Sequence, residues 1–105
     1  LFLGVAYKPD IDDERESPAL RIIDEVIKKG GIVSYHDPYI PEIHTEGGHR
    51  LESVELDETR LSKTDCVVIT TNHTVFDSNY ILEKSNLIVD MRNAILEKSS
   101  KVYKL

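Results

Sequence analysis

Two cationic side chains follow short apolar runs in this sequence. Lys8 comes directly after residues 1–7, and Arg92 comes two residues after the run at residues 87–90. A lysine ammonium binds phosphate oxygens as a point charge, and an arginine guanidinium binds them as a planar fork. Tyr7, beside Lys8, offers an aromatic face against which a base could stack. The three side chains could therefore hold a nucleoside diphosphate if the fold brings them together. The alternative is that both cations are solvated surface residues, as lysine and arginine usually are.

The apolar runs that precede these residues are typical of strands covered on both faces. The predicted strands are residues 1–7, 32–35, 66–70, 87–90 and 101–105, and residues 53–56 could add a short edge strand. Residues 38–50 contain two prolines and a Gly-Gly pair and show little periodicity. This composition predicts a loop.

Helices are predicted between these strands. Ser17 followed by Pro18 is a helix-start signal, because the serine side chain caps the first turn and proline lacks only an N–H that would have no partner there. Apolar residues then recur at helical spacing until the Gly-Gly pair at residues 30–31 ends the helix. Two shorter helices are expected over residues 57–62 and 77–84.

Strands that alternate with helices indicate an α/β fold: a Rossmann-like, doubly wound, mainly parallel sheet of about five to six strands in a single domain. Ligands bind to such sheets beyond the carboxyl ends of the strands, where the strand order reverses. The residues at that edge include Lys8, Asp37 with His36, residues 71–73, and Arg92. In a doubly wound strand order, the strands before Lys8 and Arg92 lie two apart, on the order of 10 Å. The sequence therefore predicts a pyrophosphate site between these two cations.

Composition excludes several classes of protein. The 105 residues carry 13 basic and 19 acidic side chains, a formal net charge of −6, with no basic face for nucleic acid. No apolar run approaches the roughly 20 residues that a membrane span needs, and no signal peptide is visible. One cysteine cannot form an internal disulfide, which favours a reducing, cytoplasmic location. The sequence also opens directly on an apolar run without a methionine, so we expect a piece of a longer polypeptide.

Other chemistry is disfavoured by the residue pattern. No Gly-x-Gly-x-x-Gly follows the first strand, so these residues are not expected to bind NAD themselves. Cys66 begins the most apolar strand and is most simply a small core residue rather than a nucleophile. The acidic run that includes Asp13 also contains the basic residue Arg15. We interpret it as solvated or salt-bridged rather than as a metal site. A phosphorylatable receiver domain is also disfavoured. The lysine of such a domain follows one of the last strands, whereas the lysine here follows the first.

The sequence resembles the C-terminal, UDP-binding domain of the UDP-glucose/GDP-mannose dehydrogenase family. The matching segments cover essentially the whole chain in the family's order: residues 4–10, 12–19, 35–41, 70–76 and 90–93. The Asp-Pro-Tyr-Ile-Pro segment at residues 37–41 is similar to the branch that acts on UDP-N-acetylhexosamines rather than on UDP-glucose. Residues 1–105 are thus expected to be the UDP-sugar-binding domain of a longer dehydrogenase.

The resemblance implies an NAD-dependent enzyme that oxidises the carbon-six alcohol of a UDP-sugar to the carboxylate. NAD would be bound by an N-terminal domain, and the catalytic cysteine would precede a central helical region, both outside these residues. The resemblance also implies that the parent protein is a homodimer or a larger oligomer. No catalytic residue is therefore expected here, Cys66 does not inherit that role, and the piece by itself is expected to be inactive.

The resemblance assigns three substrate-binding residues. The family's aromatic–lysine pair falls on Tyr7 and Lys8, which would contact the nucleotide, and its arginine falls on Arg92, which would meet the phosphates. The family's loop aspartate and arginine fall on Asp13 and Arg15, which we interpret as shaping the loop. Two rival functions remain open: a Rossmann-like nucleotide-binding or scaffolding module that belongs to no oxidoreductase, and a structural lobe that binds no ligand.

Overall fold

The computed structural model describes residues 1–10 and 17–104 as alternating strands and helices. The strands are β1 (Phe2–Leu3), β2 (Tyr35–His36), β3 (Glu42–His44), β4 (Arg50–Glu52), β5 (Val67–Ile69), β6 (Ile88–Asp90) and β7 (Val102–Lys104). The helices are α1 (Pro18–Lys28), α2 (Glu58–Lys63) and α3 (Ser78–Lys84). All three predicted helices are therefore present.

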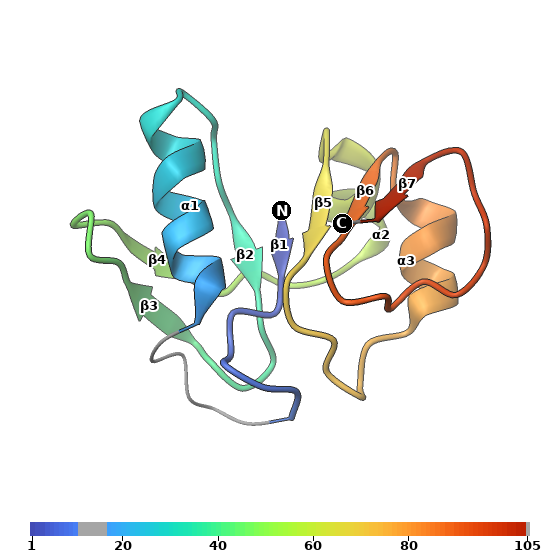
Figure 1. Ribbon diagram of the computed structural model, residues 1–105, viewed down its shortest axis with the longest axis horizontal. Helices are drawn as coiled ribbons and strands as arrows, with labels where there is room; N and C mark the ends of the chain where they lie inside the picture. Colours follow the sequence, from blue (N-terminus) through green and yellow to red (C-terminus); the bar gives the residue numbers. More distant parts are fainter. Residues whose placement is uncertain (11–16, 105) are drawn as a thin grey trace.

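Five of these strands form one parallel sheet in the order β2-β1-β5-β6-β7 (Figure 1). The chain starts at β1, places β2 on one side of it, and then returns to place β5 on the other side. The strand order therefore reverses at β1, as it does in doubly wound folds, which confirms the predicted Rossmann-like class. Because β5 separates β1 from β6, the strands before Lys8 and Arg92 are two apart, as expected.

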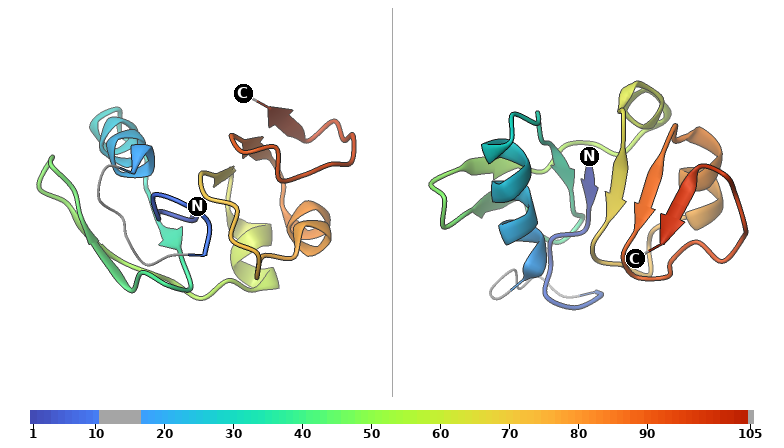
Figure 2. Two further views of the ribbon diagram at one scale, coloured as in Figure 1. Left: turned by 60° about the horizontal axis from the view of Figure 1, so that its bottom comes forward. Right: turned by 45° about the horizontal axis from the view of Figure 1, so that its top comes forward.

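Helices cover both faces of this sheet, with α1 on one face and α2 and α3 on the other (Figure 2). Neighbouring residues of β1 point to opposite faces, as strand geometry requires. Phe2 belongs to an apolar cluster with Ile23 of α1, whereas Leu3 belongs to a second cluster with Leu61 of α2 and Ile81 of α3. The two clusters hold the sheet from both sides and fix the positions of its strand ends.

The helix ends follow the sequence signals. The Ser17 hydroxyl accepts a hydrogen bond from the backbone N–H of Ala19 at 3.3 Å, and Pro18 occupies the first turn of α1. Asp57 and Asp77 cap α2 and α3 in the same way. Among the described residues, no helix combines the length and the apolar character needed to cross a membrane.

The cap of α1 gives a measurable stability contribution. Replacing Ser17 with alanine is expected to lower the free energy of unfolding by about 1 kcal/mol, because an N-terminal N–H loses its acceptor. Ser62, an exposed residue inside α2, is the matched control. Its replacement by alanine should leave stability nearly unchanged, because the higher helix propensity of alanine offsets the loss of the exposed hydrogen bond from the Ser62 hydroxyl to the Thr59 carbonyl oxygen. Urea unfolding measures both variants, and equal stabilities would show that the cap contributes nothing.

The prediction of a loop over residues 38–50 was wrong. This segment and the residues after it form the antiparallel hairpin of β3 and β4, which is separate from the main sheet. Arg50 binds the carboxylates of Glu42 and Glu52 at 2.7 and 2.8 Å. These ion pairs fasten the hairpin on its exposed face. The strands are three residues each, too short to show the alternation that identifies a strand in sequence.

The first predicted strand is also shorter in the structure than expected, since β1 ends at Leu3. Gly4 has a φ of +81°, a left-handed conformation that breaks the extended backbone. The chain then bends across the carboxyl end of the sheet instead of continuing through Tyr7 as a strand. This early bend sends the following residues over the sheet edge, where the candidate site lies.

Candidate functional site

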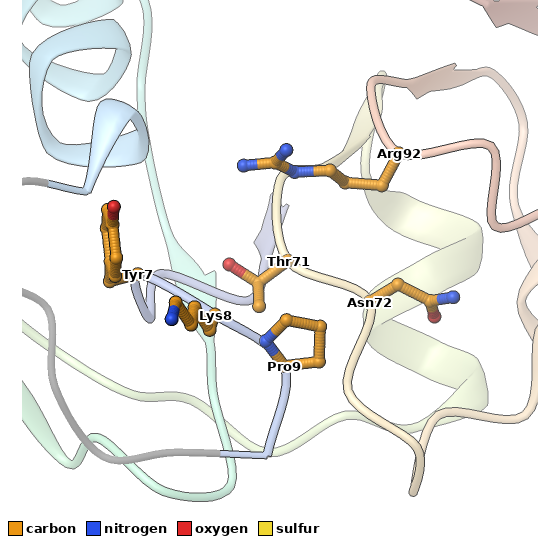
Figure 3. A pocket seen from close by; sticks show the side chains of 6 residues that line it. All are labelled: Tyr7, Lys8, Pro9, Thr71, Asn72 and Arg92. Atoms are coloured by element: carbon orange, nitrogen blue, oxygen red, sulfur yellow. The ribbon is translucent and has the colours of Figure 1, made fainter.

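A pocket of about 340 Å³ lies beyond the carboxyl ends of β1, β5 and β6. The residues that line it come from the three segments that follow these strands: Tyr7, Lys8, Pro9, Thr71, Asn72 and Arg92 (Figure 3). The structure therefore brings Tyr7, Lys8 and Arg92 to one cavity at the sheet edge that the topology rule selects.

Two hydrogen bonds hold Arg92 in place, one from its backbone N–H and one from its side-chain Nε. Its backbone N–H donates to the carboxylate of Asp90 at 3.1 Å, and its Nε donates to the carbonyl oxygen of Thr70 at 2.9 Å. The two terminal nitrogens of the fork remain at the pocket side, and Figure 3 shows the guanidinium extending over Thr71 toward Tyr7. Arg92 is thus oriented before any ligand binds.

Asp90 shapes the loop that carries Arg92. Its side chain is fully buried at the end of β6. Besides the Arg92 N–H, its carboxylate accepts the backbone N–H groups of Ala94 at 3.0 Å and Ile95 at 2.8 Å. A buried carboxylate is stable in such a place because several donors replace its water. The sequence pattern did not single out Asp90 for this task.

Tyr7 and Lys8 form the opposite wall of the pocket. Both side chains are exposed, and the Lys8 ammonium lies 5.7 Å from the centre of the Tyr7 ring, a cation–π distance. Among the carboxylates of residues 1–10 and 17–104, none forms an ion pair with Lys8 or Arg92. Two cations without such partners, on an edge of a chain with net charge −6, are available to an anion.

The backbone beneath the pocket is tied to the end of β5. The Thr71 hydroxyl donates to the carbonyl oxygen of Ala6 at 2.6 Å, and the Thr70 hydroxyl donates to that of Gly4. Thr71 and Asn72 were expected at this edge from the strand order. That Thr70 and Thr71 also fasten the segment before Tyr7 could not be seen in the sequence.

His36 and Asp37, also expected at the binding edge, do not line the pocket. The ring of His36 is hydrogen-bonded through Nδ1 to the carbonyl oxygen of Val54 at 2.6 Å. The Asp37 carboxylate is buried and accepts the backbone N–H of Val5 at 2.8 Å. The edge rule locates these residues correctly but does not say which of them turn inward.

Other candidate chemistry finds no support in the described residues. Cys66 precedes β5 at the amino end of the sheet, away from the pocket, and burial raises the pKa of its thiol, which disfavours a nucleophile. No group of three metal-binding side chains occurs within residues 1–10 and 17–104. Asp13 and Arg15 lie outside the described residues.

Comparisons with known proteins give consistent results. The sequence profile described as "UDP-glucose/GDP-mannose dehydrogenase family, UDP binding domain" matches residues 1–97. A UDP-N-acetyl-D-mannosamine dehydrogenase of Methanococcus vannielii is 35% identical over 75 residues, which are 71% of this chain and 16% of that protein. The corresponding protein of Pyrococcus horikoshii is 36% identical over 76 residues, again 16% of its length. The chain therefore spans about a sixth of these relatives.

Solved structures show the same fold. The UDP-D-ManNAc dehydrogenase of Pyrococcus horikoshii matches with a TM-score of 0.71 and 28% identity, covering 98% of this chain and 24% of that one. A GDP-mannose dehydrogenase of Pseudomonas aeruginosa matches with a TM-score of 0.73 over 98% of this chain and 27% of that one. At 21% identity, the second likeness concerns the fold alone.

Proposed function

Because the chain belongs to the UDP-glucose/GDP-mannose dehydrogenase family and matches its UDP binding domain, we propose that residues 1–105 are the UDP-gripping lobe of a longer enzyme. That enzyme would be an NAD-dependent nucleotide-sugar 6-dehydrogenase, which oxidises the carbon-six alcohol of a UDP-sugar to the carboxylate. Tyr7, Lys8 and Arg92 are the proposed substrate-binding residues.

One observation carries this proposal: Lys8 and Arg92 line the same pocket from strands two apart in the sheet. The guanidinium is already anchored through its Nε, so its two terminal nitrogens are left to bind phosphate oxygens. The Lys8 ammonium, beside the Tyr7 ring, supplies a second positive charge to the lining of the same pocket. Tyr7 supplies an aromatic face beside Lys8, where the uracil ring would stack.

The contribution of this lobe to catalysis would be positional. Binding energy from the remote UDP moiety would fix carbon six of the sugar against the cofactor and the nucleophile on another lobe. The sequence contains no Gly-x-Gly-x-x-Gly motif, which agrees with NAD being bound by a separate N-terminal domain. The piece alone would therefore bind a UDP-sugar without oxidising it.

The sugar is proposed to be a UDP-N-acetylhexosamine, with UDP-glucose as the alternative. The named functions of the relatives from Methanococcus vannielii and Pyrococcus horikoshii support the first choice. The partners of this lobe would be the N-terminal and central parts of the parent chain, assembled as a homodimer or a larger oligomer. A cytoplasmic location is part of the proposal, because a single cysteine that can form no internal disulfide is typical of a reducing compartment.

Calorimetric titration with UDP, UMP and uridine tests the proposed function. A site built on two cations should prefer UDP to UMP by about tenfold or more, because a charge-assisted hydrogen bond contributes about 1.5–3 kcal/mol. Uridine should bind least. Equal affinities for the three compounds, or no binding at millimolar concentrations, would contradict a diphosphate grip and favour a lobe that binds no nucleotide.

A further inference from the structure

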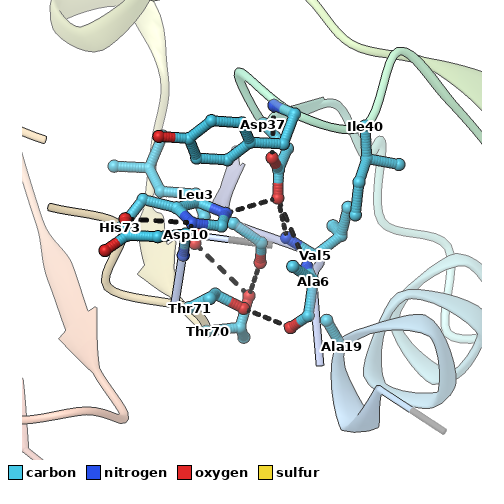
Figure 4. A network of polar contacts seen from close by, with 12 residues as sticks. Leu3, Val5, Ala6, Asp10, Ala19, Asp37, Ile40, Thr70, Thr71 and His73 are labelled. Atoms are coloured by element: carbon cyan, nitrogen blue, oxygen red, sulfur yellow. Dashed lines mark hydrogen bonds and ion pairs between the residues drawn. The ribbon is translucent and has the colours of Figure 1, made fainter. Parts of the chain in front are cut away.

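A buried pair, His73 and Asp37, is hydrogen-bonded to backbone N–H groups that precede Tyr7 and follow Pro9 (Figure 4). The Nε2 atom of His73 lies 2.8 Å from Oδ2 of Asp37, and both side chains are completely buried. Asp37 follows β2, and His73 follows β5 on the other side of β1. The pair thus joins two strand ends across the strand that leads to Lys8.

The hydrogen bonds fix the tautomer of His73. Its Nδ1 accepts the backbone N–H of Asp10 at 2.7 Å, so Nδ1 carries no proton. The proton must then sit on Nε2, which donates it to Asp37. The rings of Tyr39 and Phe76 contact the imidazole edge-on at 4.8 and 5.4 Å between centres and hold its orientation.

Asp37 and His73 accept hydrogen bonds from backbone N–H groups on either side of residues 7–9. The Oδ2 atom of Asp37 also accepts the N–H groups of Val5 at 2.8 Å and Ala6 at 3.2 Å, just before Tyr7. His73 holds the N–H of Asp10, just after Pro9. Residues 7–9, all of which line the pocket, are therefore bracketed by one connected set of buried hydrogen bonds.

Asp10 itself is held in a conformation that aspartate adopts at a cost. Its φ is +63°, in the left-handed region. Its carboxylate accepts the N–H of Thr74 at 2.7 Å and the Thr74 hydroxyl, and these hydrogen bonds lower the pKa of Asp10, which keeps the group ionised. Backbone held in a sparsely populated conformation at a site is a sign of pre-organisation.

We propose that His73, oriented by Asp37, is a positioning residue that fixes the Tyr7–Pro9 segment and so presents Lys8 to the diphosphate before the ligand binds. This inference rests on the proposed function. His73 does not line the pocket, so it acts only through the backbone that it holds. A segment ordered in advance spares the ligand the entropic cost of ordering it.

Two variants of His73 separate its two hydrogen bonds. In His73→Asn, the side-chain oxygen takes the place of Nδ1 and can still accept the Asp10 N–H. In His73→Gln, the side-chain amide nitrogen takes the place of Nε2 and can still donate to Asp37, but the Asp10 N–H loses its acceptor. We expect UDP affinity to fall about tenfold or more in the glutamine variant and about threefold or less in the asparagine variant.

A ligand-free measurement keeps this inference distinct from the proposed function. The N–H of Asp10 is hydrogen-bonded to His73, and the N–H of Thr74 is hydrogen-bonded to the Asp10 carboxylate. Amide hydrogen exchange at Asp10 and Thr74 should therefore accelerate in His73→Gln but not in His73→Asn, whether or not UDP binds. Wild-type protein that binds no UDP would overturn the proposed function. Equal UDP affinities or equal exchange rates in the two variants would overturn the positioning role of His73.

Thr74→Ala covers the case in which the glutamine variant does not fold. Thr74 is exposed, so its replacement removes a hydroxyl from the Asp10 carboxylate without opening the core. Val75→Ala, at the next exposed position, is the control. Thr74→Ala should accelerate exchange at the Asp10 N–H relative to this control, because the Asp10 carboxylate loses one of the bonds that hold this residue in place. Identical exchange in the two variants would contradict the bracketing of residues 7–9.

Discussion

Replacing either Lys8 or Arg92 with alanine is expected to weaken UDP binding by about 1.5–3 kcal/mol, or roughly 10- to 150-fold. Each substitution removes a cation from a pocket in which, among the described residues, the cations have no carboxylate partner. Both side chains are exposed, so the folded structure should survive either change. Calorimetry on the two variants, after circular dichroism confirms their folding, measures the loss.

Two further variants control for net charge. Lys29→Ala and Arg21→Ala remove exposed cations of the same kinds from α1 and its end, so they lower the net charge equally. They should retain wild-type affinity. Arg92→Lys should also bind weakly, because a lysine cannot bond the Thr70 carbonyl and present a fork at the same time. Affinities of the Lys8 and Arg92 variants that match those of the controls would remove both residues from the site.

The second large effect is expected at Gly4. Gly4→Ala should lower the free energy of unfolding by more than about 3 kcal/mol, because a left-handed φ is strained for alanine and its methyl group would collide with fixed backbone. At a φ of +81°, the added Cβ would stand 2.5 Å from Cβ of Thr71 and nearer still to the Thr71 carbonyl oxygen. Urea unfolding gives the change directly.

A variant at Gly48 separates the cost of the left-handed φ from the cost of the collision between the added methyl group and its neighbours. Gly48 has a similar φ of +87° in the hairpin, but an added Cβ there would meet no atom within 4 Å. Gly48→Ala should therefore show only the conformational cost, about 1 kcal/mol. If Gly4→Ala is no more destabilising than Gly48→Ala, the close contact between the ends of β1 and β5 does not constrain the fold as described.

Local signals in the sequence predict the helices and the class of the sheet. Ser17, Asp57 and Asp77 are capping residues whose chemistry is independent of the rest of the fold, and each one caps a helix in the structure. The alternation of strands and helices predicts the parallel order. That order brings Lys8 and Arg92 to one edge of the sheet. Their meeting in one pocket also depends on the bend of the chain at Gly4 and on the bond between Arg92 and the Thr70 carbonyl oxygen, which the sequence does not show.

What escapes sequence analysis depends on contacts between distant segments. His73 and Asp37 are separated by 36 residues, and nothing near either of them shows that they pair beneath β1. Asp37 looks like a ligand-binding carboxylate at a strand end, yet its carboxylate already accepts hydrogen bonds from backbone N–H groups. Gly4 looks like part of a strand, because no neighbour in the sequence shows that its φ is left-handed or that Thr71 leaves no room for a Cβ there.

A crystal structure of the chain bound to UDP is the most direct measurement. The diphosphate should lie between Nζ of Lys8 and the terminal guanidinium nitrogens of Arg92, with oxygens of both phosphates within about 3 Å of these atoms. The segment from Tyr7 to Pro9 should keep its ligand-free conformation. Phosphates bound elsewhere, for example near Ser17 and Arg21 at the start of α1, would show that the two cations do not form the nucleotide site.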